Sequence, residues 1–294
     1  MKISGIYKII NKINGKYYVG SSVNIKDYPN NRWSRHIADL NANRHHNDYL
    51  QRAWNKYGKD AFEFIIIENY NSKCEKELLL IEQKYLDIAL NEIDALVNID
   101  FLSRTIKEEK KSVSIIRMGT CGSLQGEVGV NELVAGTHGL GIDNVLHFYT
   151  QENNEEEKAI LAAFEKHTSI HTHKIQPYIS SASKNLIQHF TEGYSKGITV
   201  TCPGFYGPQG RILRLPLKMP QLVDQMTSFR FEQHRIANFE METSAIYGLC
   251  NLLGHQCLSI NVIIANRVKK EYSKDMGKAV DHMIQKSLGI IATI

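Results

Sequence analysis

The chain has 294 residues, of which 43% are hydrophobic and 22% charged, so we expect one large globular domain or two of ordinary size. No apolar run approaches the ~18 residues of a membrane span, and the first residues lack a signal-peptide pattern, so we expect no membrane partner. Five cysteines without Cys-x-x-Cys spacing indicate reduced thiols and a cytoplasmic location.

The net charge of +4 hides an asymmetry along the chain. Residues 1–60 hold 11 Lys/Arg and 4 Asp/Glu, a net charge of +7, whereas residues 61–100 hold 3 Lys/Arg and 9 Asp/Glu, a net charge of −6. A basic surface beside an acidic segment suits a polyanion site with a carboxylate metal ligand nearby. Two solvated faces without a partner would give the same charges, so composition leaves both interpretations open.

The first expected element is a β-hairpin. Residues 3–10 and 16–21 are short apolar-aromatic runs on either side of Asn14-Gly15, and this dipeptide between two such runs is a strong hairpin signal. A third strand is expected at 62–68. Together they predict an α+β domain with a small antiparallel sheet flanked by helices.

Three helices are expected beside that sheet. Residues 47–57 form the clearest one, with Asn47 as a plausible N-cap and Gly58 as a stop. The other two are residues 32–41 and residues 73–90, each with apolar side chains on one face.

The pattern of apolar and polar residues changes after residue 100. We expect a first domain at 1–100, a polar junction at 101–111 and a second domain at 112–294. In the second domain, strand-like apolar runs alternate with helical patterns, which predicts an α/β layer fold. The helices expected there lie at residues 155–167, 239–255 and 274–294.

Polar and glycine residues across the first hundred positions carry a family resemblance. Gly5-Ile6-Tyr7 and Tyr18-Val19-Gly20 lie on the two hairpin strands and resemble the paired triplets of the GIY-YIG nucleases. The loop before Arg32 is a few residues longer than is usual in that family, which makes Arg35 the alternative to Arg32. The family's remaining positions are matched by Arg32 in RWSRH, His36 and His45 in the second basic cluster, Glu82 in LLLIEQKYL and Asn98 in ALVNI.

This resemblance implies a metal-dependent DNA endonuclease. Glu82 would hold Mg²⁺ or Mn²⁺, since one carboxylate and several waters are enough for a cation that prefers oxygen ligands. Tyr7 would be a general base with a lowered pKa beside the metal, and Arg32 would stabilise the pentavalent phosphate. Tyr18 would orient the phosphate or water, and His45 would be a secondary proton or phosphate contact. DNA is the implied partner.

From about residue 112 the chain resembles the uridine phosphorylase branch of the nucleoside phosphorylases. The resemblance is carried by three motifs in the family's order, IRMGT at 116–120, FYGPQGR at 205–211 and FEME at 239–242. It implies a three-layer α/β sandwich of nucleoside phosphorylase type, here truncated.

The same resemblance implies a site for phosphate, ribose and uracil, with no metal and with phosphate as co-substrate. Arg117 and Thr120 would bind phosphate, the arginine through its forked donors. Glu242 would accept hydrogen bonds from the ribose hydroxyls, with Met241 packed beside the sugar. Four residues would surround the base, with Gln209 and Arg211 at its polar edge, Phe205 stacked on it and Arg267 reaching it through water.

The opening segment of such phosphorylases has no counterpart before residue 112. That segment supplies several strands and a Gly-Asp-Pro phosphate loop, so we expect uncovered sheet edges and absent or severely reduced uridine phosphorolysis. Three interpretations stay open. They are an endonuclease with an appended phosphorylase-like module, a phosphorylase relative whose first part was replaced, and a non-functional fusion or sequence-assembly artefact. A homo-oligomer would form through the phosphorylase-like part.

Overall fold

Two compact units, Met1–Ile81 and Glu82–Ile294, make up the chain, and each is considered by itself. The computed structural model describes residues 4–15, 17–22, 25–26, 31–45, 47–70 and 75–294. It describes only the backbone of residues 4–6, 19–22, 48, 67–70 and 75–86.

The first unit is built on a three-stranded antiparallel sheet in the order β2-β1-β3. The expected hairpin is confirmed, with Gly15 in the left-handed region at φ 70°, where glycine is favoured. The third expected strand is also confirmed. The bounds are β1 (Ser4–Asn11), β2 (Tyr17–Ser22) and β3 (Phe62–Tyr70).

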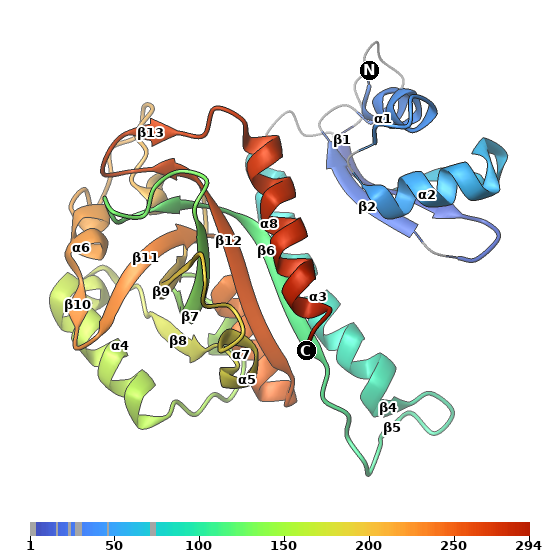
Figure 1. Cartoon of the computed structure of the whole chain (residues 1–294). Helices are drawn as coiled ribbons and strands as arrows, with labels where there is room; N and C mark the ends of the chain where they lie inside the picture. Colours follow the sequence, from blue (N-terminus) through green and yellow to red (C-terminus); the bar gives the residue numbers. More distant parts are fainter. Residues whose placement is uncertain (1–3, 16, 23–24, 27–30, 46, 71–74) are drawn as a thin grey trace. The chain divides into compact units, whose positions relative to one another are not determined.

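Two capped helices, α1 (Arg32–Asn41) and α2 (Asp48–Tyr57), accompany this sheet (Figure 1). Asn47 caps α2 as expected, because its Oδ1 accepts the N–H of Leu50 at 2.8 Å. Gly58 ends the helix at φ 76°. The core of this unit is formed by apolar side chains from the three strands and the two helices, among them Ile9, Leu40, Leu50, Trp54 and Phe62.

Helix α3 (Glu75–Asn98) is longer than the helix expected at 73–90. Its second half packs within the second unit, where Leu90 is 3% exposed and joins a hydrophobic cluster with Ile246 and Met283. This burial explains the extension, since packing of an apolar face stabilises a helix more than propensity does. The short strands β4 (Ile99–Asp100) and β5 (Thr105–Ile106) follow it as a two-stranded sheet.

The second unit contains a mixed sheet whose central strands close on themselves. The strands β12, β6, β11, β9 and β7 pair in that order, and β7 pairs again with β12. The expectation of uncovered edges at this sheet is therefore wrong for the ring itself, because each ring strand is paired on both sides. The remaining strands β13, β10 and β8 extend from β12, β11 and β7.

The strands of this unit follow one another along the chain with helices between them. The strands are β6 (Ser114–Ser123), β7 (Leu133–Gly141), β8 (Tyr178–Ser181), β9 (Tyr194–Thr201), β10 (Arg230–Phe231), β11 (His234–Glu240), β12 (Gln256–Asn266) and β13 (Glu271–Tyr272). The helices are α4 (Glu155–Thr168), α5 (Lys184–Ile187), α6 (Leu222–Ser228), α7 (Thr243–Leu253) and α8 (Met276–Ile291).

Helices cover this sheet, so the expected α/β architecture is confirmed. Figure 1 shows α8 running along β12 and β6, and α7 packs on β7, β8 and β12. The helix expected at 239–255 begins only at Thr243, because residues up to Glu240 pair in β11 with β6 and β9. Among the helices described, none is both long and apolar enough to span a membrane.

Candidate functional site

A chain of hydrogen bonds ends on the hydroxyl of Tyr7 in the first unit. The backbone N–H of Asn47 donates to Nδ1 of His45 at 3.0 Å, which places the proton of a neutral His45 on Nε2. That proton is donated to Nδ1 of His36 at 2.6 Å, and Nε2 of His36 then donates to Oη of Tyr7 at 2.5 Å. Nε of Arg32 donates to the same oxygen at 3.2 Å. The Tyr7 oxygen therefore accepts two hydrogen bonds.

Local sequence explains how this cluster forms. Tyr7 is fully buried on β1, and Arg32 and His36 lie four residues apart on one face of α1. Arg32, rather than the exposed Arg35, contacts the tyrosine. The family resemblance matches His36 to the second basic cluster without giving it a role, and its contact with Tyr7 now places it in the cluster.

Tyr18 completes the aromatic side of the cluster. Its half-buried ring lies on β2 with its centroid 5.3 Å from that of His36 and 6.2 Å from that of His45. The structure thus brings together four of the six residues expected for the nuclease site, namely Tyr7, Tyr18, Arg32 and His45.

The electrostatics of Tyr7 differ from the expectation for a base. Burial raises the pKa of Tyr7 to about 12, and the hydrogen bond from Arg32 opposes this only in part. Burial also disfavours the charged form of Arg32, but its contacts with Tyr7 outweigh this and raise the pKa of Arg32. With protein groups alone, Tyr7 is protonated at neutral pH and Arg32 is a cation.

The last two expected residues of the nuclease site lie on α3. The backbone of Glu82 is helical, and its side chain lies outside the described residues. Asn98 belongs to the second unit and is 2% exposed. Its amide donates to Oδ1 of Asp94 at 2.6 Å and to the carbonyl of Lys111 at 3.1 Å, and it accepts the N–H of Lys111 at 2.6 Å. These bonds fix the backbone at Lys111 to the end of α3, so Asn98 has a structural role. Its catalytic role stays a prediction.

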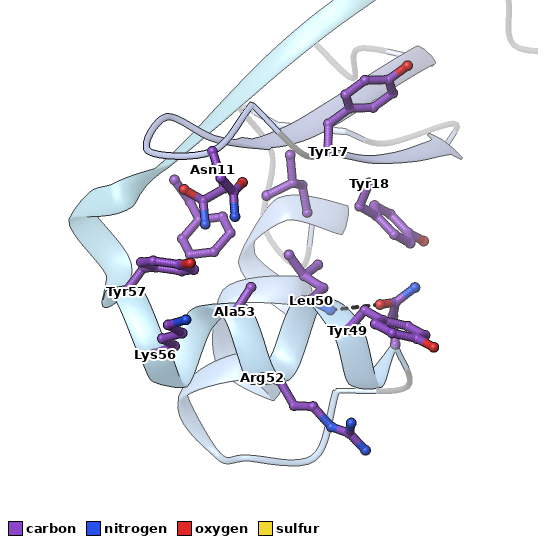
Figure 2. A pocket seen from close by; sticks show the side chains of 13 residues that line it. Asn11, Tyr17, Tyr18, Tyr49, Leu50, Arg52, Ala53, Lys56 and Tyr57 are labelled. Atoms are coloured by element: carbon purple, nitrogen blue, oxygen red, sulfur yellow. Dashed lines mark hydrogen bonds between the residues drawn. The ribbon is translucent and has the colours of Figure 1, made fainter. Parts of the chain in front are cut away.

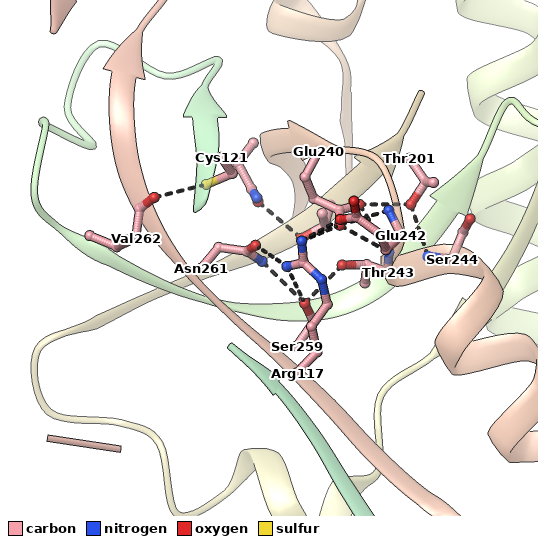
Figure 3. Close-up of polar contacts among 12 residues, drawn as sticks. Arg117, Cys121, Thr201, Glu240, Glu242, Thr243, Ser244, Ser259, Asn261 and Val262 are labelled. Atoms are coloured by element: carbon pink, nitrogen blue, oxygen red, sulfur yellow. Dashed lines mark hydrogen bonds and ion pairs between the residues drawn. The ribbon is translucent and has the colours of Figure 1, made fainter. Parts of the chain in front are cut away.

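In the second unit Arg117 is the centre of a buried polar cluster (Figure 3). Its guanidinium lies between two carboxylates and two neutral groups, with Nη2 3.2 Å from Glu240 and in contact with Glu242, and Nη1 donating to Oδ1 of Asn261 at 2.6 Å. Nη1 also lies 3.4 Å from Oγ of Ser259. Burial opposes the charge of Arg117, but the two carboxylates outweigh it and raise the pKa of Arg117.

Glu240 was not among the residues expected at this site. It is 4% exposed and accepts the N–H of Thr243, at the start of α7, at 3.0 Å. Burial works against its charge, yet Arg117 and the hydrogen bonds from Glu242 and Thr243 hold the pKa of Glu240 below its usual value. The strand pairing of β11 with β6 and β9 places it there, which local sequence does not reveal.

The residues expected around a nucleobase form a second group near Phe239. The guanidinium of Arg211 lies 3.7 Å from the ring centre of Phe205, and Arg211 donates to the side chain of Gln209. Nη2 of Arg267 lies 3.3 Å from the carbonyl oxygen of Gln209. Burial and the nearby charge of Arg267 lower the pKa of Arg211.

The other two residues expected at this site are Met241, just after the end of β11, and Thr120, on β6. Met241 is 8% exposed and directly follows β11. Thr120 is half-buried on β6, paired with Val262 of β12. The second unit therefore has two polar groups that could bind a ligand. One is Arg117 between Glu240 and Glu242, and the other is Arg211 beside the ring of Phe205.

Two family models match separate parts of the chain. The model described as GIY-YIG catalytic domain matches residues 3–88, and the one described as phosphorylase superfamily matches residues 94–294. The boundary between the two matches falls within α3.

Relatives of each kind are found among characterised proteins. Intron-associated endonuclease 1 of Enterobacteria phage T4 is 41% identical over 88 residues, which is 30% of this chain and 33% of that protein. A uridine phosphorylase of Haemophilus influenzae is 21% identical over 184 residues, which is 61% of this chain and 64% of that protein. The chain thus spans about a third of the first relative and less than two thirds of the second.

A solved structure supports the second match. A nucleoside phosphorylase from Trypanosoma brucei, described as showing uridine phosphorylase activity, aligns with a TM-score of 0.65 at 27% identity, covering 72% of this chain and 77% of that one. The chain therefore belongs to the phosphorylase superfamily through residues 94–294 and carries a GIY-YIG catalytic domain at residues 3–88.

Proposed function

We propose that the first unit, together with Glu82, hydrolyses phosphodiester bonds in DNA with the help of Mg²⁺ or Mn²⁺. The observation that carries the proposal is the Tyr7 hydroxyl, which accepts hydrogen bonds from His36 and Arg32 in a buried cluster. Two donors on one phenol oxygen stabilise the phenolate whenever it forms, which suits a group that takes a proton from water.

The side chains of the cluster divide the chemistry between them. Arg32 carries the positive charge that a pentavalent phosphate requires. His36 and His45 keep one donor aimed at Tyr7, since the backbone N–H of Asn47 sets the tautomer of the whole chain. Tyr18, beside both imidazoles, would orient the phosphate or the water through its hydroxyl.

The cation would be held by Glu82. Among the residues with described side chains, no three His, Cys, Asp or Glu residues come together as a metal site. A single carboxylate with waters fits Mg²⁺, which keeps much of its hydration and prefers oxygen ligands. When bound, a dication would supply the positive charge that brings the pKa of Tyr7 down from about 12.

Nicking of supercoiled plasmid tests this proposal. We expect nicking that requires Mg²⁺ or Mn²⁺ and stops with chelator. Tyr7→Phe keeps the buried ring and removes only the oxygen, so it should lower the nicking rate by about 100-fold or more, as loss of a general base does. Nicking by Tyr7→Phe at the wild-type rate would refute the role of this hydroxyl.

We also propose that the phosphorylase-like unit cleaves uridine with phosphate poorly or not at all. Arg117 and Thr120 would be its remaining phosphate contacts, and the Gly-Asp-Pro loop of the family has no counterpart before residue 112. The lack of that loop supports this, because Arg117, already paired with Glu240 and Glu242, would be left as the one arginine for a phosphate dianion. The residues around Phe205 would still be able to bind uridine or uracil.

The absorbance change of uridine in phosphate tests this second proposal. We expect a rate close to that of the Arg117→Ala variant, and uracil release at a rate typical of phosphorylases would contradict it.

A homo-oligomer through this unit remains part of the proposal, to be tested by the solution mass. Long-read sequencing across codons 95–120 in independent isolates tests the fusion, and a broken reading frame would favour the artefact.

A further inference from the structure

A cavity of about 610 Å³ lies between the β1–β2 hairpin and α2 in the first unit (Figure 2). It is within the range of ~300–1,000 Å³ that is usual for small-molecule sites. In Figure 2, Asn11 and Tyr57 lie on one side of the cavity, Tyr18 and Tyr49 on the other, and Leu50 lies between them.

The lining of this cavity combines aromatic rings with positive charge. Tyr17 and Tyr49 are 65% and 76% exposed, so their rings are available to a ligand. Nζ of Lys56 lies 5.1 Å from the ring centre of Tyr57, and Arg52 is one helical turn before Lys56 on α2. The lining residues that the structure describes include no carboxylate. This composition favours an anion that carries a flat aromatic group.

A buried donor in the cavity wall lacks an acceptor. Asn11 is 2% exposed and lines the cavity, and its Oδ1 accepts the N–H of Ile13 at 2.9 Å. Its Nδ2 has no hydrogen-bond partner within the described part of the chain. Buried polar groups are nearly always paired, so this donor has a hydrogen bond left to give, to a water or to a ligand acceptor such as a base carbonyl or a phosphate oxygen.

We infer that this cavity binds one unstacked nucleotide of the DNA strand, next to the proposed cleavage site. Tyr49 stacks on the base, Lys56 contacts the phosphate, and Nδ2 of Asn11 donates to the nucleotide. Tyr18 joins the two sites, because it lines the cavity and its ring centre lies 5.3 Å from that of His36. The inference rests on the proposed nuclease function and adds a preference for DNA with an unpaired nucleotide.

Fluorescence anisotropy of labelled DNA tests the inference on the full-length Glu82→Gln protein, which should bind DNA without cutting it. Two duplexes are compared, one fully paired and one with a single unpaired nucleotide. We expect tighter binding of the second. Tyr49→Ala should weaken that binding about 5- to 150-fold, the range for loss of one base–aromatic stack. It should change binding of the paired duplex much less.

Two further variants and two controls sharpen the test. Asn11→Asp keeps the acceptor for Ile13 but removes the free donor, so it should also weaken binding of the unpaired nucleotide. Lys56→Gln should reduce the salt dependence of binding by about one phosphate contact. The matched controls are Lys59→Gln, an exposed lysine outside the cavity lining, and Tyr272→Ala, a tyrosine that is 73% exposed in the second unit. Both should bind like the parent.

The inference is overturned if Tyr49→Ala, Asn11→Asp and Lys56→Gln bind both duplexes as the parent does, with melting curves confirming that they are folded. Displacement of the DNA by an equal concentration of free nucleotide would also overturn it, because the cavity would then serve free nucleotides. If the parent binds neither duplex, the inference fails as well. The wild-type nicking assay then shows whether the proposed function fails with it.

Discussion

Replacing Leu90 by alanine should destabilise the second unit and leave the first unit unaffected. Leu90 lies on α3 beyond the end of the GIY-YIG match, yet it is 3% exposed within the core of the phosphorylase-like unit. Truncation of a buried leucine to alanine costs about 2–5 kcal/mol of unfolding free energy, through lost transfer energy and the cavity left behind. This is a large share of the ~5–15 kcal/mol that stabilises a domain.

Urea unfolding can resolve the two units because both tryptophans of the chain, Trp33 and Trp54, lie in the first one. Tryptophan fluorescence therefore reports on the first unit, and circular dichroism on both. We expect Leu90→Ala to shift the dichroism transition of the second unit to lower urea without moving the fluorescence transition. The matched control is Leu96→Ala on the same helix, where the side chain is 66% exposed and the cost should stay within about 0.5 kcal/mol.

The packing of Leu90 in the core of the second unit is refuted if the two leucine variants unfold at the same urea concentration. It is also refuted if Leu90→Ala moves the fluorescence transition instead, because α3 would then belong to the core of the first unit throughout.

Three further predictions concern charge and hydrogen bonding in the second unit. Burial lowers the pKa of His138 from 6.5 to about 4. The unfolded chain binds its proton first, so stability should fall by up to about 3 kcal/mol from pH 6.5 to 4. Urea unfolding at pH 7.5 and 4.5 measures this, and His138→Gln should reduce the loss. Arg117→Met leaves Glu240 buried without its cation and should cost about 3–5 kcal/mol, partly restored by adding Glu240→Gln. Asn98→Ala should cost about 1–3 kcal/mol, because the N–H of Lys111 loses its acceptor. Wild-type stability in any of these variants would contradict the corresponding contact.

Elements with local signals were predicted well from the sequence. The hairpin followed from Asn14-Gly15, and the start of α2 followed from Asn47, because a turn and a cap depend on residues close together in the chain. The contact between Arg32 and Tyr7 agrees with the order of the family's residues, and the geometry adds His36 between Tyr7 and His45.

Features that depend on distant parts of the chain could not be predicted. The pairing of Arg117 with Glu240 joins residues on two strands, and the sequence suggested instead that Glu240 begins a helix. Helix α3 was expected to end near residue 90, since only the packing of Leu90 on the second unit reveals its continuation. The pKa of Tyr7 depends on burial, which acts in the opposite direction to the lowering expected for a base.

A comparison of two glutamates on one helix tests most directly the proposed metal-dependent nuclease activity, in which Glu82 holds the cation. Glu82→Gln and Glu92→Gln remove the same charge from α3, and Glu92 is exposed to solvent. With supercoiled plasmid and Mg²⁺, we predict that Glu92→Gln nicks at the wild-type rate and that Glu82→Gln gives no nicking above background. Equal nicking by Glu82→Gln and Glu92→Gln would contradict the account.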